Sequence, residues 1–215
     1  MARSKIEWLA RPGTLPESWN PVTGCTKVSE GCANCYAERM SKRLAGRFGY
    51  PEAPHQFDVT LHPDKLDLPM KWRKPRTVFV VSMGDLFHED VLTQTIALTW
   101  RTMHHAPDHT FLVLTKRPSR MLRFLKTYDI KPLPNVWLGS TVENDKHYDR
   151  IHDLLQCPAA VRFVSIEPML GPVDLSYWLD YDVSIGERPA LDWIIVGGET
   201  GPGARPPWIV TGKRS

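Results

Sequence analysis

The chain has 215 residues, of which 42% are hydrophobic and 24% charged, and its 27 Lys and Arg against 24 Asp and Glu give a formal net charge of +3. This balance excludes a disordered or fibrous protein, and four cysteines are too few for a disulfide-based scaffold. The net charge is too small to indicate a nucleic-acid partner by itself. A chain of this length fits one α/β domain, which we expect to span residues 1–215.

The chain shows no sign of membrane insertion or export. No stretch approaches the roughly 20 consecutive apolar residues of a membrane span, and the first residues, MARSKIEWLARPG, lack the apolar core of a signal peptide. We therefore expect a cytoplasmic protein with no membrane partner. Because the cytosol keeps thiols reduced, clustered cysteines there indicate metal or redox chemistry rather than disulfides.

In chain order, the sequence predicts an early helix and a short strand, followed by strands that alternate with helices. The helix begins at the last clustered cysteine and covers 35–49, and the strand covers 56–63. Apolar runs rich in Val, Ile, Phe and Trp predict further strands at 77–82, 110–115, 135–140, 161–166 and 192–197. Helical spacing of apolar residues predicts helices at 90–106, 118–128 and 144–157. Prolines and glycines in 168–191 predict an irregular segment or a short helix.

The strand runs indicate the fold class. They are nearly continuous rather than alternating, as is typical of parallel strands covered on both faces. Successive runs start 25 to 33 residues apart, which is the length of a strand plus a crossover helix. We expect an α/β fold with a full or partial (β/α) barrel rather than an open doubly wound sheet, because no glycine-rich dinucleotide loop follows the first strand.

Polar side chains follow each of the five strands predicted from residue 77 onward. Functional groups of parallel α/β folds gather at such strand ends. The side chains here are Asp85, Lys116, Glu143, Glu167 and Glu199. Together they would suit a polar ligand or proton transfer, and Lys116 with Arg117 would equally suit a phosphate or a nucleic-acid backbone. The alternative is that they are helix N-caps and solvated loop charges, and Arg117 would then share a solvated helix face with Arg120 and Arg123.

The segment GCTKVSEGCANCY (24–36), here called the cysteine loop, carries the most specific chemistry. It holds Cys25, Cys32 and Cys35 in the spacing C-x6-C-x2-C. Three thiolates can ligate a metal, and a separation of two residues lets two sulfurs face one centre. With no fourth cysteine nearby, one coordination position stays open, whereas a structural zinc site normally has four protein ligands. The alternative is three unrelated free cysteines.

A fourth metal ligand would have to come from a distant part of the chain. His88 follows a predicted strand end and is the best candidate for a zinc ligand or a proton carrier. Cys157 lies at a predicted helix end after two leucines, where a small buried hydrophobe is the better interpretation.

Basic and aromatic residues allow two interpretations each. Four basic residues share one face of the helix predicted at 35–49, namely Arg39, Lys42, Arg43 and Arg47. They form either a solvated surface or a contact strip for an anionic partner. Stacking surfaces for bases are available at Trp19, Trp72, Trp137 and Trp208, although core packing is the commoner role of such residues.

Several ordered segments resemble one protein family. They are WNPVTGCTKVSEGCANCYAERM, SMGDLFHEDV, LTKRP, NVWLGSTVEN, FVSIEPMLGPV and WIIVGGETGPGARP. The chain is similar, from about Trp19 to Pro206, to the phage-associated three-Cys-motif proteins, and the resemblance implies a phage protein acting in the host cytoplasm. It also leads us to expect a shortened C-terminus.

That family in turn resembles radical S-adenosylmethionine enzymes, in which three cysteines of the loop after the first barrel strand hold a [4Fe-4S] cluster. The open iron of the cluster binds S-adenosylmethionine. The resemblance implies Cys25, Cys32 and Cys35 as cluster ligands, with Tyr36 beside the last of them. The first gap here is six residues where those enzymes have three, and the Gly-Gly-Glu motif at 197–199 follows the last strand rather than the second.

Two hypotheses follow. In the first, the chain is an iron-sulfur enzyme that uses S-adenosylmethionine for radical chemistry on a nucleic acid or nucleotide. Its expected catalytic residues are Asp85, Lys116, Glu143 and Glu167, and its expected cofactor-binding residues are Tyr36, Ser140, Asn144, Gly197, Gly198 and Glu199. In the second, the chain is a non-catalytic protein whose three cysteines and a histidine hold zinc, and its basic helix docks nucleic acid or a phage or host protein.

Overall fold

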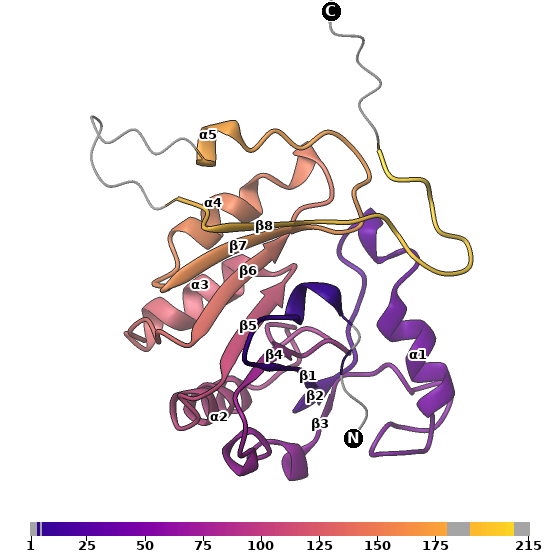
Figure 1. The fold of residues 1–215 in the computed structure, drawn as a ribbon. Helices are drawn as coiled ribbons and strands as arrows, with labels where there is room; N and C mark the ends of the chain where they lie inside the picture. Colours follow the sequence, from indigo (N-terminus) through magenta and orange to yellow (C-terminus); the bar gives the residue numbers. More distant parts are fainter. Residues whose placement is uncertain (1–3, 5, 180–189, 209–215) are drawn as a thin grey trace, which may run out of the picture.

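The computed structural model describes residues 4, 6–179 and 190–208. Its main sheet is entirely parallel, in the order β1-β4-β5-β6-β7-β8. The strands are β1 Leu15–Trp19, β4 Arg76–Val80, β5 Thr110–Thr115, β6 Val136–Thr141, β7 Val161–Ile166 and β8 Trp193–Val196. This sheet curls into a half-barrel with β1 and β8 at its edges (Figure 1). A small antiparallel pair, β2 Val22–Thr23 with β3 Thr60–Leu61, lies beside it.

Helices connect the parallel strands. They are α1 Tyr36–Leu44, α2 Thr93–His104, α3 Pro118–Thr127, α4 Asp149–Leu155 and α5 Ser176–Leu179, and 3-10 turns cover Glu7–Leu9, Glu30–Cys32, Pro63–Lys65, Pro69–Lys71 and Asp145–His147. Figure 1 shows α2, α3 and α4 along the outer side of the half-barrel, while α1 lies apart, beyond the β1 edge. Within the described part of the chain, no helix is both long and apolar enough to cross a membrane.

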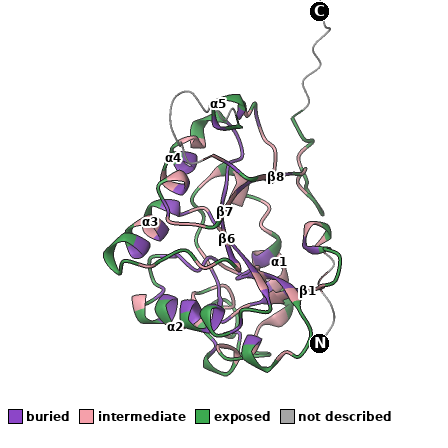
Figure 2. Ribbon diagram, turned by 60° about the vertical axis from the view of Figure 1, so that its left-hand side comes forward, coloured by how far each residue is buried: buried purple, intermediate pink, exposed green. Residues whose placement is uncertain are grey.

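Both faces of the sheet are covered, which explains the continuous apolar runs. On the outer face, Phe111 and Val113 of β5 belong to the main core, which the helices complete. On the inner face, Leu112 packs in a second core with Phe163 and Leu9. Leu9 comes from the N-terminal segment, so this segment closes part of the barrel interior. The buried strands run through the middle of the molecule and the helices expose their outer surfaces (Figure 2).

The prediction of parallel strands from residue 77 onward is confirmed by β4 to β8, and a partial barrel is present. β1 was missed because its sequence, LPESW, contains a proline and a charged residue. Arg76 of β4 donates a hydrogen bond to Glu17 of β1, so the carboxylate is neutralised where it is buried. Strand β1 therefore depends on its neighbour rather than on its own propensity.

Other boundaries differ from the predictions. The expected strand at 56–63 is wrong except for β3, because a turn in which Asp58 N donates to His55 O keeps the preceding residues from extending. The predicted helix at 35–49 ends at Leu44. The predicted helix at 144–157 becomes a 3-10 turn capped by the Asn144 side chain, and α4 begins only at Asp149. Residues 180–189 of the expected irregular segment, and residues 209–215 at the C-terminus, lie outside the described residues.

Candidate functional site

The cysteine loop starts at the carboxyl edge of the half-barrel. Gly24 bridges to Gly84 after β4, and its N–H donates to Met83 O at 2.9 Å. The backbone of Gly24 has φ +86°, and a Cβ there would lie 2.2 Å from the carbonyl oxygen of Asp58. Only glycine fits this position. The loop is therefore held in the mouth of the barrel from its first residue.

The three cysteines of the loop meet at one cavity. Cys25, Cys32 and Cys35 are half-buried, none is in a disulfide, and all three line a cavity of about 170 Å³. Strand ends supply its other wall, including Asp85 and Arg117. Among the described residues, no group of three or more His, Cys, Asp or Glu is arranged to hold a single metal ion. Three cysteines in one loop are a donor set of the kind that iron-sulfur clusters use, in which each iron takes a separate thiolate.

Cys25 is the cysteine most tightly held by its surroundings. Arg117 Nη1 donates a hydrogen bond to its sulfur at 3.4 Å, and the thiol donates to Thr26 O at 3.3 Å. Burial raises the pKa of Cys25 to about 11, and Asp85 adds to the rise while Arg117 opposes it. Arg117 is only 6% exposed, so it does not form the solvated helix face considered for it.

His88 is buried beside the loop and does not face the cysteine cavity. His88 Nε2 lies 2.8 Å from Thr26 Oγ1, and Asp90 N donates to His88 Nδ1 at 3.1 Å. Burial and Arg117 lower the pKa of His88, so the neutral ring is favoured. The structure thus places this histidine as a support for the loop rather than beside the three sulfurs.

Glu143 holds the middle of the cysteine loop. Its carboxylate is fully buried and accepts from Ser29 Oγ at 2.6 Å and from Arg150 Nη1 at 2.8 Å. Lys116 Nζ lies 3.3 Å from Oε1 of Glu143, the oxygen that also accepts from Ser29. Burial alone would raise the pKa of Glu143, but Lys116, Ser29 and Arg150 outweigh it and hold the pKa below its ordinary value. The next residue, Asn144, donates to Glu30 of the loop.

Glu199 holds the far end of the cysteine loop through the segment 199–205, here called the clasp. Its carboxylate accepts from Asn34 Nδ2 at 2.8 Å and from Arg205 N at 2.8 Å. The Arg205 side chain is the main reason that the pKa of Glu199 falls to about 2. Arg39 of α1 donates to carbonyl oxygens of the clasp at 3.0 and 3.2 Å. The glycine-rich segment after β8 therefore packs on the cysteine loop.

The remaining candidates, Asp85, Ser140 and Gly197, are engaged by hydrogen bonds within the protein. Asp85 is 5% exposed, and its carboxylate accepts from Thr115, from backbone N–H groups and from Arg117, so its lone pairs are engaged. Ser140 is buried and donates to Thr115 O at 3.1 Å. The backbone of Gly197 makes two hydrogen bonds. Its N–H donates to the carbonyl of Ile166 in β7, and its carbonyl accepts from the N–H of Met169.

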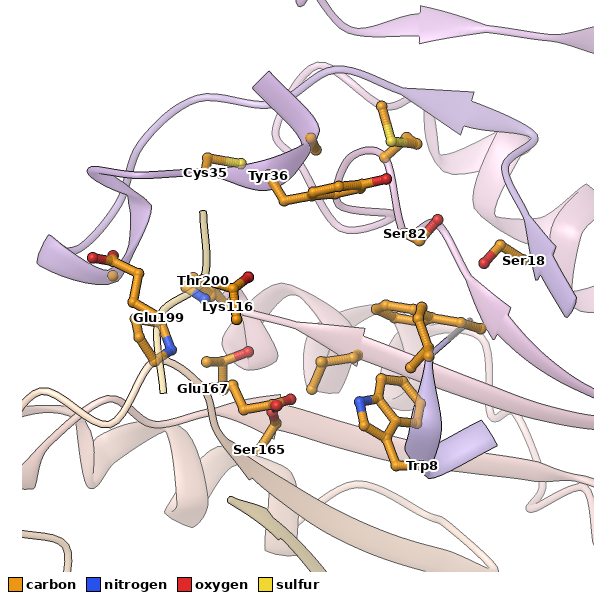
Figure 3. A pocket seen from close by; sticks show the side chains of 18 of the residues that line it. Trp8, Ser18, Cys35, Tyr36, Ser82, Lys116, Ser165, Glu167, Glu199 and Thr200 are labelled. Carbon is orange, nitrogen blue, oxygen red and sulfur yellow. The ribbon is translucent and has the colours of Figure 1, made fainter. Parts of the chain in front are cut away.

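A larger cavity, of about 970 Å³, lies on the inner side of the half-barrel and adjoins the cysteine cavity. Cys35 and Lys116 line both. Figure 3 shows Glu167, Tyr36 and Trp8 among its lining side chains. Its wall also includes Ser18, Phe79, Ser82, Ser165, Gly198 and Glu199. Of the expected site residues, Lys116, Glu167, Tyr36, Gly198 and Glu199 line this cavity, and the Glu199 carboxylate is already engaged by Asn34 and Arg205.

Part of this cavity was not predictable from the sequence. Trp8 precedes the missed strand β1 and Ser18 belongs to it, so no strand-end signal marked either residue. The tryptophans proposed for base stacking do not form one surface, since Trp19 is buried and donates to Lys65 O, while Trp137 stacks under Arg11. Cys157 is also buried and lines neither cavity, in agreement with its interpretation as a buried hydrophobe.

A protein family described as "Protein of unknown function (DUF5131)" matches residues 3–210. No curated protein and no solved structure matches the chain.

Proposed function

The chain belongs to the DUF5131 family, and we propose that it is an iron-sulfur enzyme of the radical S-adenosylmethionine type. One observation carries the proposal: three unpaired cysteines of a single loop line one cavity, which opens onto a larger one inside a parallel half-barrel. Cys25, Cys32 and Cys35 would hold a [4Fe-4S] cluster. Such a cluster supplies the single electron for reductive cleavage of S-adenosylmethionine.

The residues around the cavities have defined tasks in this proposal. The N–H groups at the start of α1 follow Cys35 and favour negative charge there. Lys116 lines both cavities, and its ammonium, which also pairs with Glu143, would bind the carboxylate of S-adenosylmethionine. Glu167 accepts a hydrogen bond from Ser165 Oγ at 3.1 Å, faces the larger cavity and would also accept from an amine or hydroxyl of a ligand. Trp8 and Phe79 provide an apolar wall that excludes water.

Anaerobic purification tests the cluster. We expect a brown protein with about four irons and matching sulfide per chain. Cys32→Ser should lose the iron, whereas Cys157→Ser should keep it because Cys157 lies in the core, away from both cavities. A colourless protein with stoichiometric zinc would refute the proposal and support the zinc-binding alternative.

Reductive cleavage of S-adenosylmethionine tests the activity. Given a strong one-electron reductant, the loaded protein would cleave S-adenosylmethionine into methionine and a 5′-deoxyadenosyl radical, which becomes 5′-deoxyadenosine by taking a hydrogen atom from the substrate or, without substrate, from the buffer. Glu167→Gln should bind iron as the wild type does but weaken ligand binding, because Glu167 lies in the larger cavity and contacts no cysteine. Equal ligand affinity in both proteins would exclude this role of Glu167.

We also propose a nucleic acid or nucleotide as the substrate class and the cytoplasm as the site of action. Lys42 and Arg43 are exposed on α1, the helix that begins directly after Cys35, and Arg47 is exposed in the turn that follows this helix. Such a strip binds phosphates with a strong dependence on salt. Replacing all three residues by Ala should weaken binding of a labelled single-stranded oligonucleotide and reduce its salt dependence, whereas Arg101→Ala on α2, also exposed, should not. Unchanged binding in the triple variant would contradict the proposal.

A further inference from the structure

Arg117 joins the first cysteine of the loop to the end of strand β5. Its Nη1 lies 3.4 Å from Cys25 Sγ and 3.3 Å from a carboxylate oxygen of Asp85. Its Nε donates to Glu89 at 2.9 Å, and its Nη2 donates to the carbonyl of Thr26 at 3.2 Å. All three nitrogens of the guanidinium are thus engaged. Among the described residues, no other charged group donates a hydrogen bond to a sulfur of the cysteine loop.

The local sequence explains why Arg117 points inward. Pro118 is the first residue of α3, and a residue before proline avoids the helical conformation. Arg117 accordingly has φ −123° and ψ 53°, and its own N–H donates to Thr115 Oγ1 at 2.9 Å. The side chain leaves the backbone ahead of the helix and reaches the cysteine loop. Arg120, one turn later, instead donates to Val91 O and contacts no cysteine.

We propose that Arg117 is a positioning residue that fixes the Cys25 sulfur and raises the reduction potential of the cluster bound there. This inference rests on the proposed function. A hydrogen bond to a ligating sulfur withdraws electron density from the metal and so favours the reduced cluster. Because Asp85 and Glu89 offset the charge of Arg117, the effect comes from the directed N–H···S contact rather than from net charge.

The test compares variants of the reconstituted full-length protein. Iron content is measured first, and then the midpoint potential in a redox titration followed by electron paramagnetic resonance. In Arg117→Met we expect iron to bind and the equilibrium constant for reduction to fall about tenfold, which is about 59 mV for a one-electron couple. Arg120→Met is the matched control and should keep the wild-type potential.

A second variant is needed because Arg117→Met leaves the buried Asp85 carboxylate without its cation, which could prevent folding. Arg117→Lys keeps a positive charge beside Asp85 but lacks the planar fork that reaches three partners at once. It should fold, bind iron and shift the potential in the same direction as Arg117→Met. Wild-type potentials in both Arg117 variants would overturn the inference while leaving the proposed function intact. A wild-type protein that binds no iron would overturn both.

Discussion

Replacing Glu143 by Gln tests how much the cysteine loop depends on a single buried carboxylate. Glu143 is fully buried, and donors surround it from Ser29, Lys116 and Arg150. Glutamine has the same shape as glutamate, but its NH₂ group would replace one of the two carboxylate oxygens. Both of these oxygens face hydrogen-bond donors, so one donor would meet another donor. Glutamine also leaves the Arg150 side chain, only 7% exposed, without its counter-charge. Removing one partner of a buried ion pair costs about 3–5 kcal/mol.

Thermal unfolding followed by circular dichroism measures this loss. For a chain of this size we expect the midpoint to fall by about 6–20 °C. The control is Asp129→Asn, which breaks an ion pair with Lys131 whose side chains are 83% and 77% exposed. Exposed pairs contribute about 0–1 kcal/mol. If the two variants lose the same small amount, the loop does not depend on Glu143 as described.

The stability difference between the wild type and Glu143→Gln should also depend on pH. The pKa of Glu143 in the folded protein lies below its ordinary value of 4.5. The stabilisation is therefore complete above about pH 4.5, where the unfolded chain is also ionised, and is lost as pH falls toward the folded pKa. The difference between the wild type and Glu143→Gln should stay constant at neutral pH and shrink in acid. A difference that grows in acid would refute the sign of this argument.

Three further changes test the fold and the loop. A Cβ at Gly139 would lie 2.4 Å from the ring of Phe163, so Gly139→Ala should lower the unfolding free energy by about 1–3 kcal/mol. Adding Phe163→Leu should restore part of this loss, and additive losses in the double variant would contradict the contact. Glu199→Gln should speed amide hydrogen exchange in the cysteine loop about 10- to 150-fold, since charge-assisted hydrogen bonds contribute about 1.5–3 kcal/mol; unchanged exchange would show that the clasp does not hold the loop. In the metal-free native protein, alkylation should label Cys25 and Cys157 slowly because burial raises their pKa values to about 11 and about 12; rates equal to those of the unfolded chain would contradict this.

The polar residues at the strand ends divide into two groups with different tasks. Asp85, Glu143 and Glu199 have their carboxylates engaged by partners on the protein, and each partner set reaches the cysteine loop or a residue that contacts it. Lys116 and Glu167 line the larger cavity, where a ligand can reach them, although Lys116 also pairs with Glu143, and Glu199 lies in the same wall. The sequence predicted that all five would gather at one edge, but their division into loop supports and cavity residues depends on which neighbours the curled sheet brings close.

The sequence alone determined the elements whose signal is local. Continuous apolar runs predicted the parallel strands from residue 77 onward, because a strand covered on both faces has few polar positions. The spacing of Cys25, Cys32 and Cys35 predicted a shared site, because residues so close along the chain can face one centre. Only the tertiary structure decided what depends on distant partners. Strand β1 forms because Arg76 neutralises Glu17, and the clasp forms because the barrel brings Glu199 to Asn34, 165 residues away in sequence. Contacts between such distant residues follow from the curvature of the sheet, which no local pattern encodes.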